Sequence, residues 1–291
     1  MPELPEVETI RKDLSVLEGK RIISIPFMSV KTAPLGVVFF KKKITGRYIK
    51  EIKRRGKLLI FSLDKDLFFL IHLKMTGQLI YQAKNLRISG GHSLSQKDEI
   101  SSIGGKLPNK YTRAIFKLND NSLLFFNDLR KFAYFKLVNK EELNEIIENG
   151  YGIEPLRPEF TLKSFTTIFA NRKTNLKALL LNQKLIAGLG NIYVDESLFK
   201  AGIRPDRRAD SLKKEEIYKL FKAINGIIAQ AIKYRGTTFS DYTDTSGRKG
   251  GFSAHLKVYG RKNEPCFICG QGIKKIKLAG RGTHYCEYCQ K

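Results

Sequence analysis

Long apolar runs are missing from this sequence. No stretch approaches the ~18 residues that a membrane-spanning helix needs, and the first residues lack the basic and apolar segments of a signal peptide. We therefore expect a cytoplasmic protein that does not contact membranes. The Gly-x-Gly-x-x-Gly fingerprint of nicotinamide-binding folds is also missing, and strand-like segments do not alternate with helical ones. A parallel-sheet dehydrogenase is therefore excluded.

Acidic residues are scarce relative to basic ones. The chain has 28 Asp and Glu against 53 Lys and Arg, which gives a formal charge of +25. Basic residues recur in every third of the chain, and this distribution indicates a broad surface for a polyanion, with nucleic acid as the first candidate. An anionic membrane is disfavoured because no basic segment carries an aromatic amphipathic face. With 291 residues, of which 42% are hydrophobic, the chain can hold two globular domains.

Only four cysteines are present, and they form two pairs. Cys266 and Cys269 are followed, after 16 residues, by Cys286 and Cys289. This is the spacing of a structural zinc ribbon, in which four thiolates leave no open coordination position for catalysis. Two disulfides are the alternative, which a cytoplasmic location disfavours. We expect one structural Zn²⁺, no redox cofactor, and a basic β-hairpin able to enter or clamp a groove, carrying Lys274, Lys275, Lys277 and Arg281.

The first half of the chain predicts an antiparallel β-sandwich or barrel behind an opening helix. Short segments rich in Ile, Phe and Leu are separated by turn residues, at 21–30, 48–54, 57–63, 67–72, 111–118, 122–127 and 132–138. Residues 84–109 interrupt this pattern without periodicity, as a mobile functional loop or a disordered segment would. His92 lies in that segment, so we assign it no role.

Helical patterns dominate the second half. They cover residues 162–170, 175–181 and 191–201, and a longer helix has one apolar face between 217 and 231. The fold class is therefore α+β. We expect a sandwich domain at 1–139, a linker at 140–150, a helical DNA-binding domain at 151–254 and the zinc hairpin at 255–291.

The opening residues combine an amine with nearby acids. If Met1 is removed, Pro2 offers a secondary amine, and α-amino groups titrate near ~7.7–8.0, so that part of it is a neutral nucleophile near pH 7. Glu3 could exchange protons, and Glu6 lies one helical turn further on. A helix start is the alternative interpretation. The two are compatible, because a helix would hold the amine still through the apolar face Val7, Ile10, Leu14 and Leu17.

Further candidates are weaker when taken singly. Lys57 ends a basic run, and most such runs are solvated loops. Gly56 favours a functional position instead, because a glycine permits close approach of a backbone. The Gly188-x-Gly190 turn before a helix suits a phosphate, although a plain tight turn is the alternative. Three lysines nearby could each neutralise phosphate charge, namely Lys173, Lys177 and Lys184.

Taken together, these segments resemble the bacterial formamidopyrimidine-DNA glycosylase family nearly end to end. The motifs that carry the resemblance are Pro2-Glu3-Leu4-Pro5-Glu6-Val7-Glu8-Thr9, Arg55-Gly56-Lys57, His72-Leu73-Lys74-Met75-Thr76-Gly77, Asp128-Leu129-Arg130-Lys131-Phe132, Gly188-Leu189-Gly190-Asn191-Ile192-Tyr193 and Val258-Tyr259-Gly260-Arg261, followed by the cysteine module. The resemblance implies a β-sandwich, a helix-two-turn-helix domain and a zinc hairpin, with DNA in the cleft between them. It also implies removal of oxidised purines such as 8-oxoguanine and formamidopyrimidines, followed by strand cutting through β,δ-elimination.

The resemblance also implies roles for single residues. Pro2 resembles the nucleophile that forms a Schiff base, Glu3 the proton donor, Lys57 the acid–base residue of the sugar-phosphate step and Arg281 the residue of the second elimination. Glu6 resembles a structural acid. The gap left by the flipped nucleotide would be filled by Met75, Arg130 and Phe132, and the remaining expected DNA contacts are His72, Tyr111, Lys173, Gly190 and Asn191. We expect a monomer whose partner is double-stranded damaged DNA.

The chain departs from the family pattern at three places. Lys110-Tyr111-Thr112-Arg113 stands where the family has Lys-His-x-His, residues 84–109 are longer than usual, and Ala133 replaces a glycine. Two alternatives stay open: an endonuclease VIII-like glycosylase for oxidised pyrimidines, and a non-catalytic DNA-binding protein. The residues Pro2, Glu3 and Lys57 favour an enzyme, while Leu4 and the Arg130 and Phe132 pair favour the purine branch.

Overall fold

The computed structural model describes residues 1–32, 36–91, 106–237 and 251–291, which form two compact units. The first unit contains Met1–Ile147 and Tyr234–Ser253, and the second contains Glu148–Lys233 and Ala254–Lys291. The chain therefore returns to the first unit after a long helix of the second.

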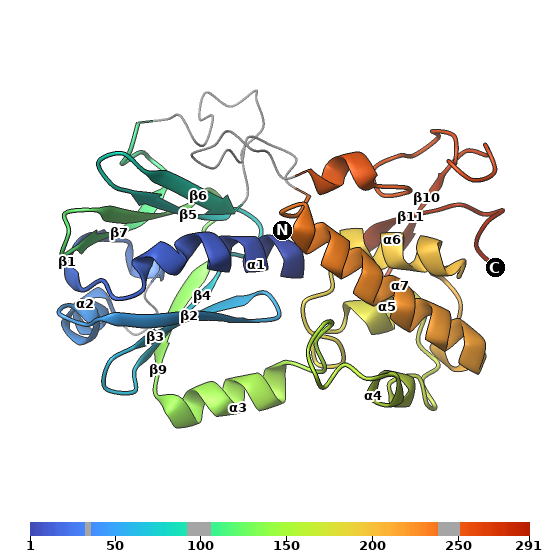
Figure 1. Cartoon of the computed structure of the whole chain (residues 1–291), viewed down its shortest axis with the longest axis horizontal. Helices are drawn as coiled ribbons and strands as arrows, with labels where there is room; N and C mark the ends of the chain where they lie inside the picture. Colours follow the sequence, from blue (N-terminus) through green and yellow to red (C-terminus); the bar gives the residue numbers. More distant parts are fainter. Residues whose placement is uncertain (33–35, 92–105, 238–250) are drawn as a thin grey trace. The chain divides into compact units, whose positions relative to one another are not determined.

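Two antiparallel sheets form the body of the first unit (Figure 1). One sheet has the order β1-β7-β8-β5-β6 and the other the order β2-β3-β4-β9. Their bounds are β1 Ile22–Met28, β2 Ile49–Arg55, β3 Leu58–Leu63, β4 Phe68–His72, β5 Gly77–Gln82, β6 Arg87–Gly91, β7 Thr112–Leu118, β8 Leu123–Asp128 and β9 Tyr134–Val138. All seven predicted strands are present, which confirms the sandwich.

Residues 84–109 contain regular structure that we did not predict. Arg87–Gly91 forms strand β6, which ends its sheet beside β5 among the described strands, so the expectation of an unstructured segment is wrong for these residues. Its pattern was missed because Ile88 is its only large apolar residue, which is sufficient for a strand that ends a sheet. His92 and the residues up to 105 lie outside the described part of the chain.

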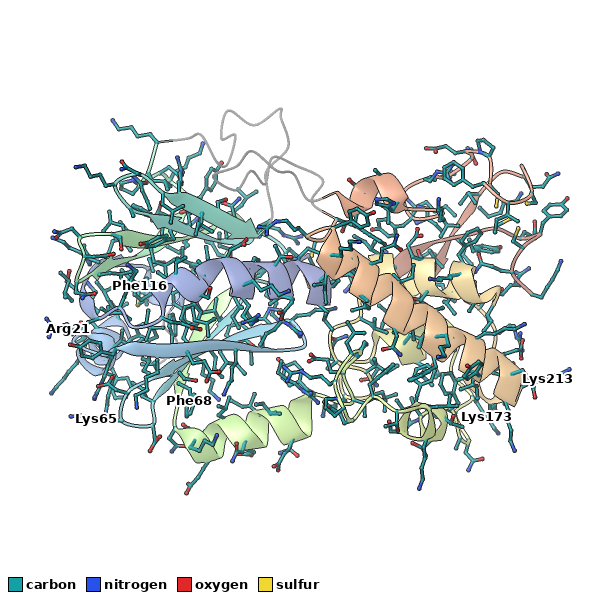
Figure 2. The ribbon with its side chains drawn as sticks, viewed as in Figure 1. Arg21, Lys65, Phe68, Phe116, Lys173 and Lys213 are labelled. Carbon is teal, nitrogen blue, oxygen red and sulfur yellow. The ribbon has the colours of Figure 1, made fainter. Side chains whose placement is uncertain are left out.

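Phenylalanine rings from both sheets meet inside the sandwich. The ring of Phe126 in β8 lies 4.5 Å from that of Phe135 in β9, and Phe69 in β4 lies 4.9 Å from Phe135. Phe116 of β7 belongs to the same cluster, and Figure 2 shows its side chain among the strands. Each buried ring contributes about 1.5–3 kcal/mol to folding, so the sandwich is held together by apolar burial.

Helix α1, Leu4–Asp13, opens the chain and continues into a 3₁₀ turn at Leu14–Leu17. The expected apolar face is confirmed, because the side chains of Val7, Ile10 and Leu14 are almost fully buried. The helix contacts β6 of one sheet and β2 and β3 of the other, and Figure 1 shows it running along the sandwich between these edges. The start of the chain is therefore anchored to both sheets.

Two further helices were not predicted. Val37–Ile44 forms α2 in the first unit, and Lys140–Gly150 forms α3 where the sequence indicated a linker. The helix α3 has a single buried residue, Leu143, so its apolar face is too narrow to give a clear helical pattern.

The second unit combines helices with a β-hairpin. Its elements are α4 Leu162–Thr167, α5 Leu176–Leu181, α6 Asn191–Ala201, α7 Lys214–Lys233, β10 Lys274–Leu278 and β11 Arg281–Tyr285. Helix α6 contacts α5, α7 and β11 and is central to the unit. The predicted helices and the predicted hairpin are all confirmed. Within the described ranges, no helix has both the length and the apolarity to cross a membrane.

Candidate active site and zinc module

The first two candidate residues, Pro2 and Glu3, are both buried, while Met1 remains 41% exposed. Glu3 caps α1, and its backbone N–H donates to Glu6 Oε2 over 2.8 Å. The other oxygen of Glu6, Oε1, accepts from the backbone N–H of Thr237 at 2.8 Å and from its hydroxyl at 3.1 Å. The helix-start interpretation is confirmed, and Glu6 joins the start of α1 to the segment after α7.

Close packing around Glu6 requires a glycine at position 236. Gly236 has φ +81°, and a Cβ built on it would lie 2.6 Å from Glu6 Oε1. A Cβ here would displace the side chain of Glu6, and the left-handed backbone would strain any residue that carries one.

Lys57 occupies the two-residue turn between β2 and β3. Gly56 precedes it with φ 54°, a backbone conformation that glycine adopts readily at the first position of such turns. The residue Lys57 is only 6% exposed, so the solvated-loop interpretation is wrong for it.

The guanidinium of Arg54 connects this turn to α1. Its Nε donates to Glu8 Oε2 at 3.0 Å, and its Nη1 donates to the carbonyl of Gly56 at 3.0 Å. Burial acts to raise the pKa of Glu8, but hydrogen bonds and charge from Arg11 and Arg54 outweigh it and hold the pKa below its ordinary value. Glu8 is therefore ionised at neutral pH, and a charged pair holds α1 and the Lys57 turn together.

His72 ends strand β4. Its Nδ1 accepts from the backbone N–H of Lys74 at 3.0 Å, and its ring stacks on Tyr134 at 5.7 Å. Burial, together with the charges of Lys74 and Lys57, lowers the pKa of His72 to about 3. The imidazole is therefore neutral at physiological pH, and with Nδ1 accepting, its proton sits on Nε2.

The three expected gap-filling residues lie on two turns. Met75 is half-buried, whereas Arg130 and Phe132 are exposed, with the guanidinium 4.8 Å from the ring centre. Lys74 and Lys131, beside them in the chain, have φ of 47° and 59°. This left-handed backbone costs roughly 1–2 kcal/mol for each residue with a Cβ, so other contacts must hold both turns.

The residues that replace the family's histidines both contact Asp128. The carbonyl of Tyr111 accepts from the Asp128 N–H at 2.9 Å, and Arg113 Nε donates to the Asp128 carbonyl at 3.0 Å. Tyr111 itself is half-buried.

In the second unit, Gly190 caps α6 and Asn191 begins it. Asn191 Nδ2 donates to the carbonyl of Gly282 at 2.9 Å, next to the exposed Arg281 at the start of β11. The turn before α6 is thereby tied to the zinc hairpin, a contact that neither the phosphate-site nor the tight-turn interpretation of the sequence indicated.

Lys177 corrects one expectation. Its ammonium is fully buried and lies 2.6 Å from Asp195 Oδ1, while Asp195 Oδ2 accepts from the His284 N–H at 2.9 Å. Lys177 therefore does not neutralise phosphate. Lys173 and Lys184 are exposed, and Figure 2 shows Lys173 beside α4.

The four cysteines converge at the base of the hairpin. All four sulfur atoms lie within 4.8 Å of one another; Cys266 Sγ is 3.8 Å from Cys289 Sγ, and Cys269 Sγ is 3.5 Å from Cys286 Sγ. Tetrahedral zinc with Zn–S bonds of ~2.3 Å separates its ligands by about 3.8 Å. The thiols are free, which excludes the disulfide alternative. The donor set fits zinc.

Two buried acids in α6, Asp195 and Glu196, have structural roles that the sequence did not predict. Glu196 in α6 accepts from the backbone N–H groups of Lys257, Val258 and Tyr259 at 2.8–2.9 Å, and burial nevertheless raises its pKa. Two sequence features could have indicated these buried charges: the acidic pair Asp195-Glu196 lies within an apolar helix, and Lys177 lies in a run of leucines. Charges in such positions indicate buried partners.

The chain is similar over its whole length to proteins of one family. The Formamidopyrimidine-DNA glycosylase N-terminal domain matches residues 1–135, the H2TH domain of the same glycosylase matches 151–243, and the zinc finger found in FPG and IleRS matches 263–291. A Formamidopyrimidine-DNA glycosylase from Heliobacterium modesticaldum is 42% identical over 294 residues, and one from Listeria monocytogenes is 39% identical over 297; each alignment covers both chains fully.

Solved structures agree with these matches. Lactococcus lactis Fpg in complex with DNA containing an abasic site is 35% identical, with a TM-score of 0.86 over 99% of each chain. The same protein in complex with DNA containing FAPY-dG is 34% identical, with a TM-score of 0.84 over 99% of this chain.

The fold and these similarities define a DNA glycosylase of base-excision repair that carries a zinc-binding β-hairpin. The chain belongs to the formamidopyrimidine-DNA glycosylase family.

Proposed function

We propose that this enzyme removes 8-oxoguanine and formamidopyrimidines from double-stranded DNA through a Schiff base on Pro2, and then cuts the strand by β,δ-elimination. The observation that carries the proposal is the buried Pro2–Glu3 pair at the hydrogen-bonded start of α1. A nucleophile held by a rigid element meets the geometric need of covalent catalysis.

The chemistry follows from a neutral amine. After Met1 is removed, the nitrogen of Pro2 attacks C1′ and the base leaves with the glycosidic electron pair. The Pro2 nitrogen then loses its proton, and the C1′–O4′ bond of the sugar ring breaks as Glu3 supplies a proton to O4′, which leaves an iminium between Pro2 and C1′. The resulting iminium acidifies C2′, so that loss of a C2′ proton expels the 3′ phosphate and a second elimination expels the 5′ phosphate. Lys57 serves the sugar-phosphate proton transfers, and Arg281 serves the second elimination.

The nucleotide must leave the base stack to reach Pro2, at a cost of a few kcal/mol. We assign the filling of the gap to Met75, Arg130 and Phe132, which the exposure of Arg130 and Phe132 supports. The proposed DNA contacts are His72, Tyr111, Lys173, Gly190 and Asn191. The neutral His72, with its proton on Nε2, is suited to donate to a phosphate oxygen.

The proposal extends to the organisation of the protein. We propose a catalytic domain at 1–139, a helical connection at 140–150, a helix-two-turn-helix domain at 151–254 and a hairpin at 255–291 that binds one Zn²⁺. The protein acts as a monomer on DNA in a bacterial cytoplasm. The four mutually close free thiols support the single ion.

Borohydride trapping tests the Schiff base. Correctly trimmed protein should form a covalent adduct with an 8-oxoguanine duplex, and Pro2→Gly and Glu3→Gln should lose excision while binding the duplex normally. Protein that retains Met1 should still bind the damaged duplex but should not cut it. Absence of any adduct from trimmed protein would reject the mechanism, and equal loss of binding would make both residues structural.

Substrate choice needs a separate comparison. Single-turnover excision from 8-oxoguanine and oxidised-thymine duplexes should favour the purine lesion. A preference for the pyrimidine would instead support the endonuclease VIII-like alternative.

A further inference from the structure

The carboxylate of Asp128 lies between the two turns that carry Met75, Arg130 and Phe132. Asp128 ends β8 opposite Gly77 of β5 and is only 1% exposed. Burial of a carboxylate without hydrogen bonds is strongly unfavourable, so its contacts show what it holds in place.

Both oxygens of Asp128 accept hydrogen bonds from these turns. Oδ1 accepts from the hydroxyl of Thr76, which follows Met75, and from the backbone N–H of Arg130 at 3.2 Å. Oδ2 accepts from the backbone N–H of Ala133, which follows Phe132, at 2.9 Å. The Arg130 N–H also donates to Thr76 Oγ1 at 3.0 Å, which closes the network. One side chain therefore connects both turns.

The backbone of Asp128 is held as firmly as its carboxylate. Its N–H donates to the Tyr111 carbonyl at 2.9 Å, and its carbonyl accepts from Arg113 Nε at 3.0 Å. Arg113 stands at a place where this chain departs from its family pattern. The carboxylate is thus fixed relative to β7 and β8 and cannot follow the turns if they move.

The two turns need such support because each contains a lysine in the left-handed region, Lys74 at φ 47° and Lys131 at φ 59°. Backbone of this kind persists only where surrounding contacts determine it. We propose that Asp128 is the positioning residue that holds Met75, Arg130 and Phe132 in one arrangement, ready to fill the gap left by the flipped nucleotide. This inference rests on the proposed function for the role of the three side chains.

An asparagine cannot replace this carboxylate. An ionised carboxylate only accepts, whereas an amide accepts at one atom and donates at the other. If the amide oxygen keeps the Ala133 bond, the amide nitrogen meets the N–H of Arg130, and two donors face each other.

The test is a double-mutant cycle on single-turnover excision from an 8-oxoguanine duplex. Asp128→Asn should lower the rate about 10- to 100-fold, the size expected for unmade buried hydrogen bonds. In a Phe132→Ala background, the same change should lower the rate by a smaller factor, because only Met75 and Arg130 are left for Asp128 to position. Equal losses in both backgrounds would overturn the inference.

A fluorescence measurement tests the arrangement without chemistry. With 2-aminopurine placed beside the lesion, the parent protein should raise the fluorescence by unstacking the base, and Asp128→Asn should raise it less. An equal rise would contradict a positioning role. If the parent protein unstacks the base but never forms a borohydride adduct, the proposed catalytic function fails while the positioning role stands.

Matched variants control for stability. Asp120→Asn changes an aspartate at the opposite end of the same hairpin, where it accepts from the Ser122 N–H at 3.1 Å, and it should leave the rate unchanged. Thr76→Val removes the hydroxyl and should lower the excision rate by a smaller factor than Asp128→Asn does. Thr76→Ser keeps a hydroxyl and should have the rate of the parent protein. If Asp128→Asn does not fold, the two threonine variants test the positioning role of Asp128, and equal excision rates for Thr76→Val and Thr76→Ser would reject that role.

Discussion

The β-sandwich and the zinc hairpin each present a cation for the proposed chemistry, Lys57 and Arg281, but they are built in opposite ways. The sandwich has a large cluster of buried side chains that come from the strands of both sheets. The buried hydrophobic cluster beside the hairpin contains only Phe199, Val258, Cys266, Ile273 and Cys286. A hairpin of two five-residue strands cannot bury enough apolar area to be stable alone, so metal and buried charge replace a core.

Removing a zinc ligand should give the largest effect in this comparison. Cys266→Ser should abolish zinc binding and weaken DNA binding by more than about 100-fold, because structural zinc contributes on the order of 10 kcal/mol to small metal modules. The sandwich should keep its own unfolding transition. Metal analysis, calorimetry and DNA titration measure the three quantities. Tyr288→Ser, an exposed change in the same knuckle, is the control, and tight DNA binding by metal-free protein would contradict the prediction.

Breaking the buried ion pair should come next. Lys177→Met or Asp195→Asn each leave one buried group without its partner, which costs about 3–5 kcal/mol. The double variant should be much less destabilised than the sum of the two, because no unmatched charge remains. Denaturant unfolding of the four proteins measures the coupling. Simple additivity would show that the pair does not hold the hairpin to α5 and α6.

Loss of the Arg54 bridge should have a smaller effect, confined to the sandwich. Arg54→Met removes the bonds to Glu8 and to the Gly56 carbonyl, and it should slow borohydride adduct formation about 10-fold. Arg11→Met removes a neighbouring partner of the same Glu8, at 2.8 Å, but leaves the Lys57 turn bonded. It should therefore change the rate less than about 3-fold. Equal effects would assign the loss to Glu8 and not to the turn.

The effect that is smallest at neutral pH is a pH dependence in the sandwich, which grows only as the pH falls. The pKa of His72 is about 3 in the folded protein against 6.5 for the ordinary side chain, so below pH 6.5 the unfolded chain binds a proton that the folded chain does not. His72 should therefore lower the stability progressively as the pH falls from 6.5 towards 3. Thermal unfolding of the parent protein and of His72→Gln at pH 7 and pH 4.5 checks this. The stability of the variant relative to the parent protein should be higher at pH 4.5 than at pH 7. A constant difference would contradict the buried neutral imidazole.

Elements with a repeating buried face were mostly predictable, and elements with one apolar residue were not. The helix that becomes α7 and the strands of the phenylalanine cluster were recognised because their buried faces repeat along the chain. Strand β6 and helix α3 were missed because Ile88 and Leu143 are nearly alone in facing a core. Strand β5 was missed as well, although it buries Leu79, Ile80 and Tyr81. Lys177 was assigned to the surface because lysine is almost never buried without a partner, and its partner lies in another helix.

The amino-acid sequence alone determined the cysteine ligand set, the apolar face of α1 and the short reach from Glu6 to Glu3, because each depends on spacing along a few residues. Only the tertiary structure decided which distant groups meet. Lys177 and Asp195 are 18 residues apart, Arg54 and Glu8 are 46 apart, and Thr76 and Asp128 are 52 apart. Local propensity acts over one or two turns of chain, whereas these contacts form only when packing of the sheets and helices brings their backbones within reach of a single side chain.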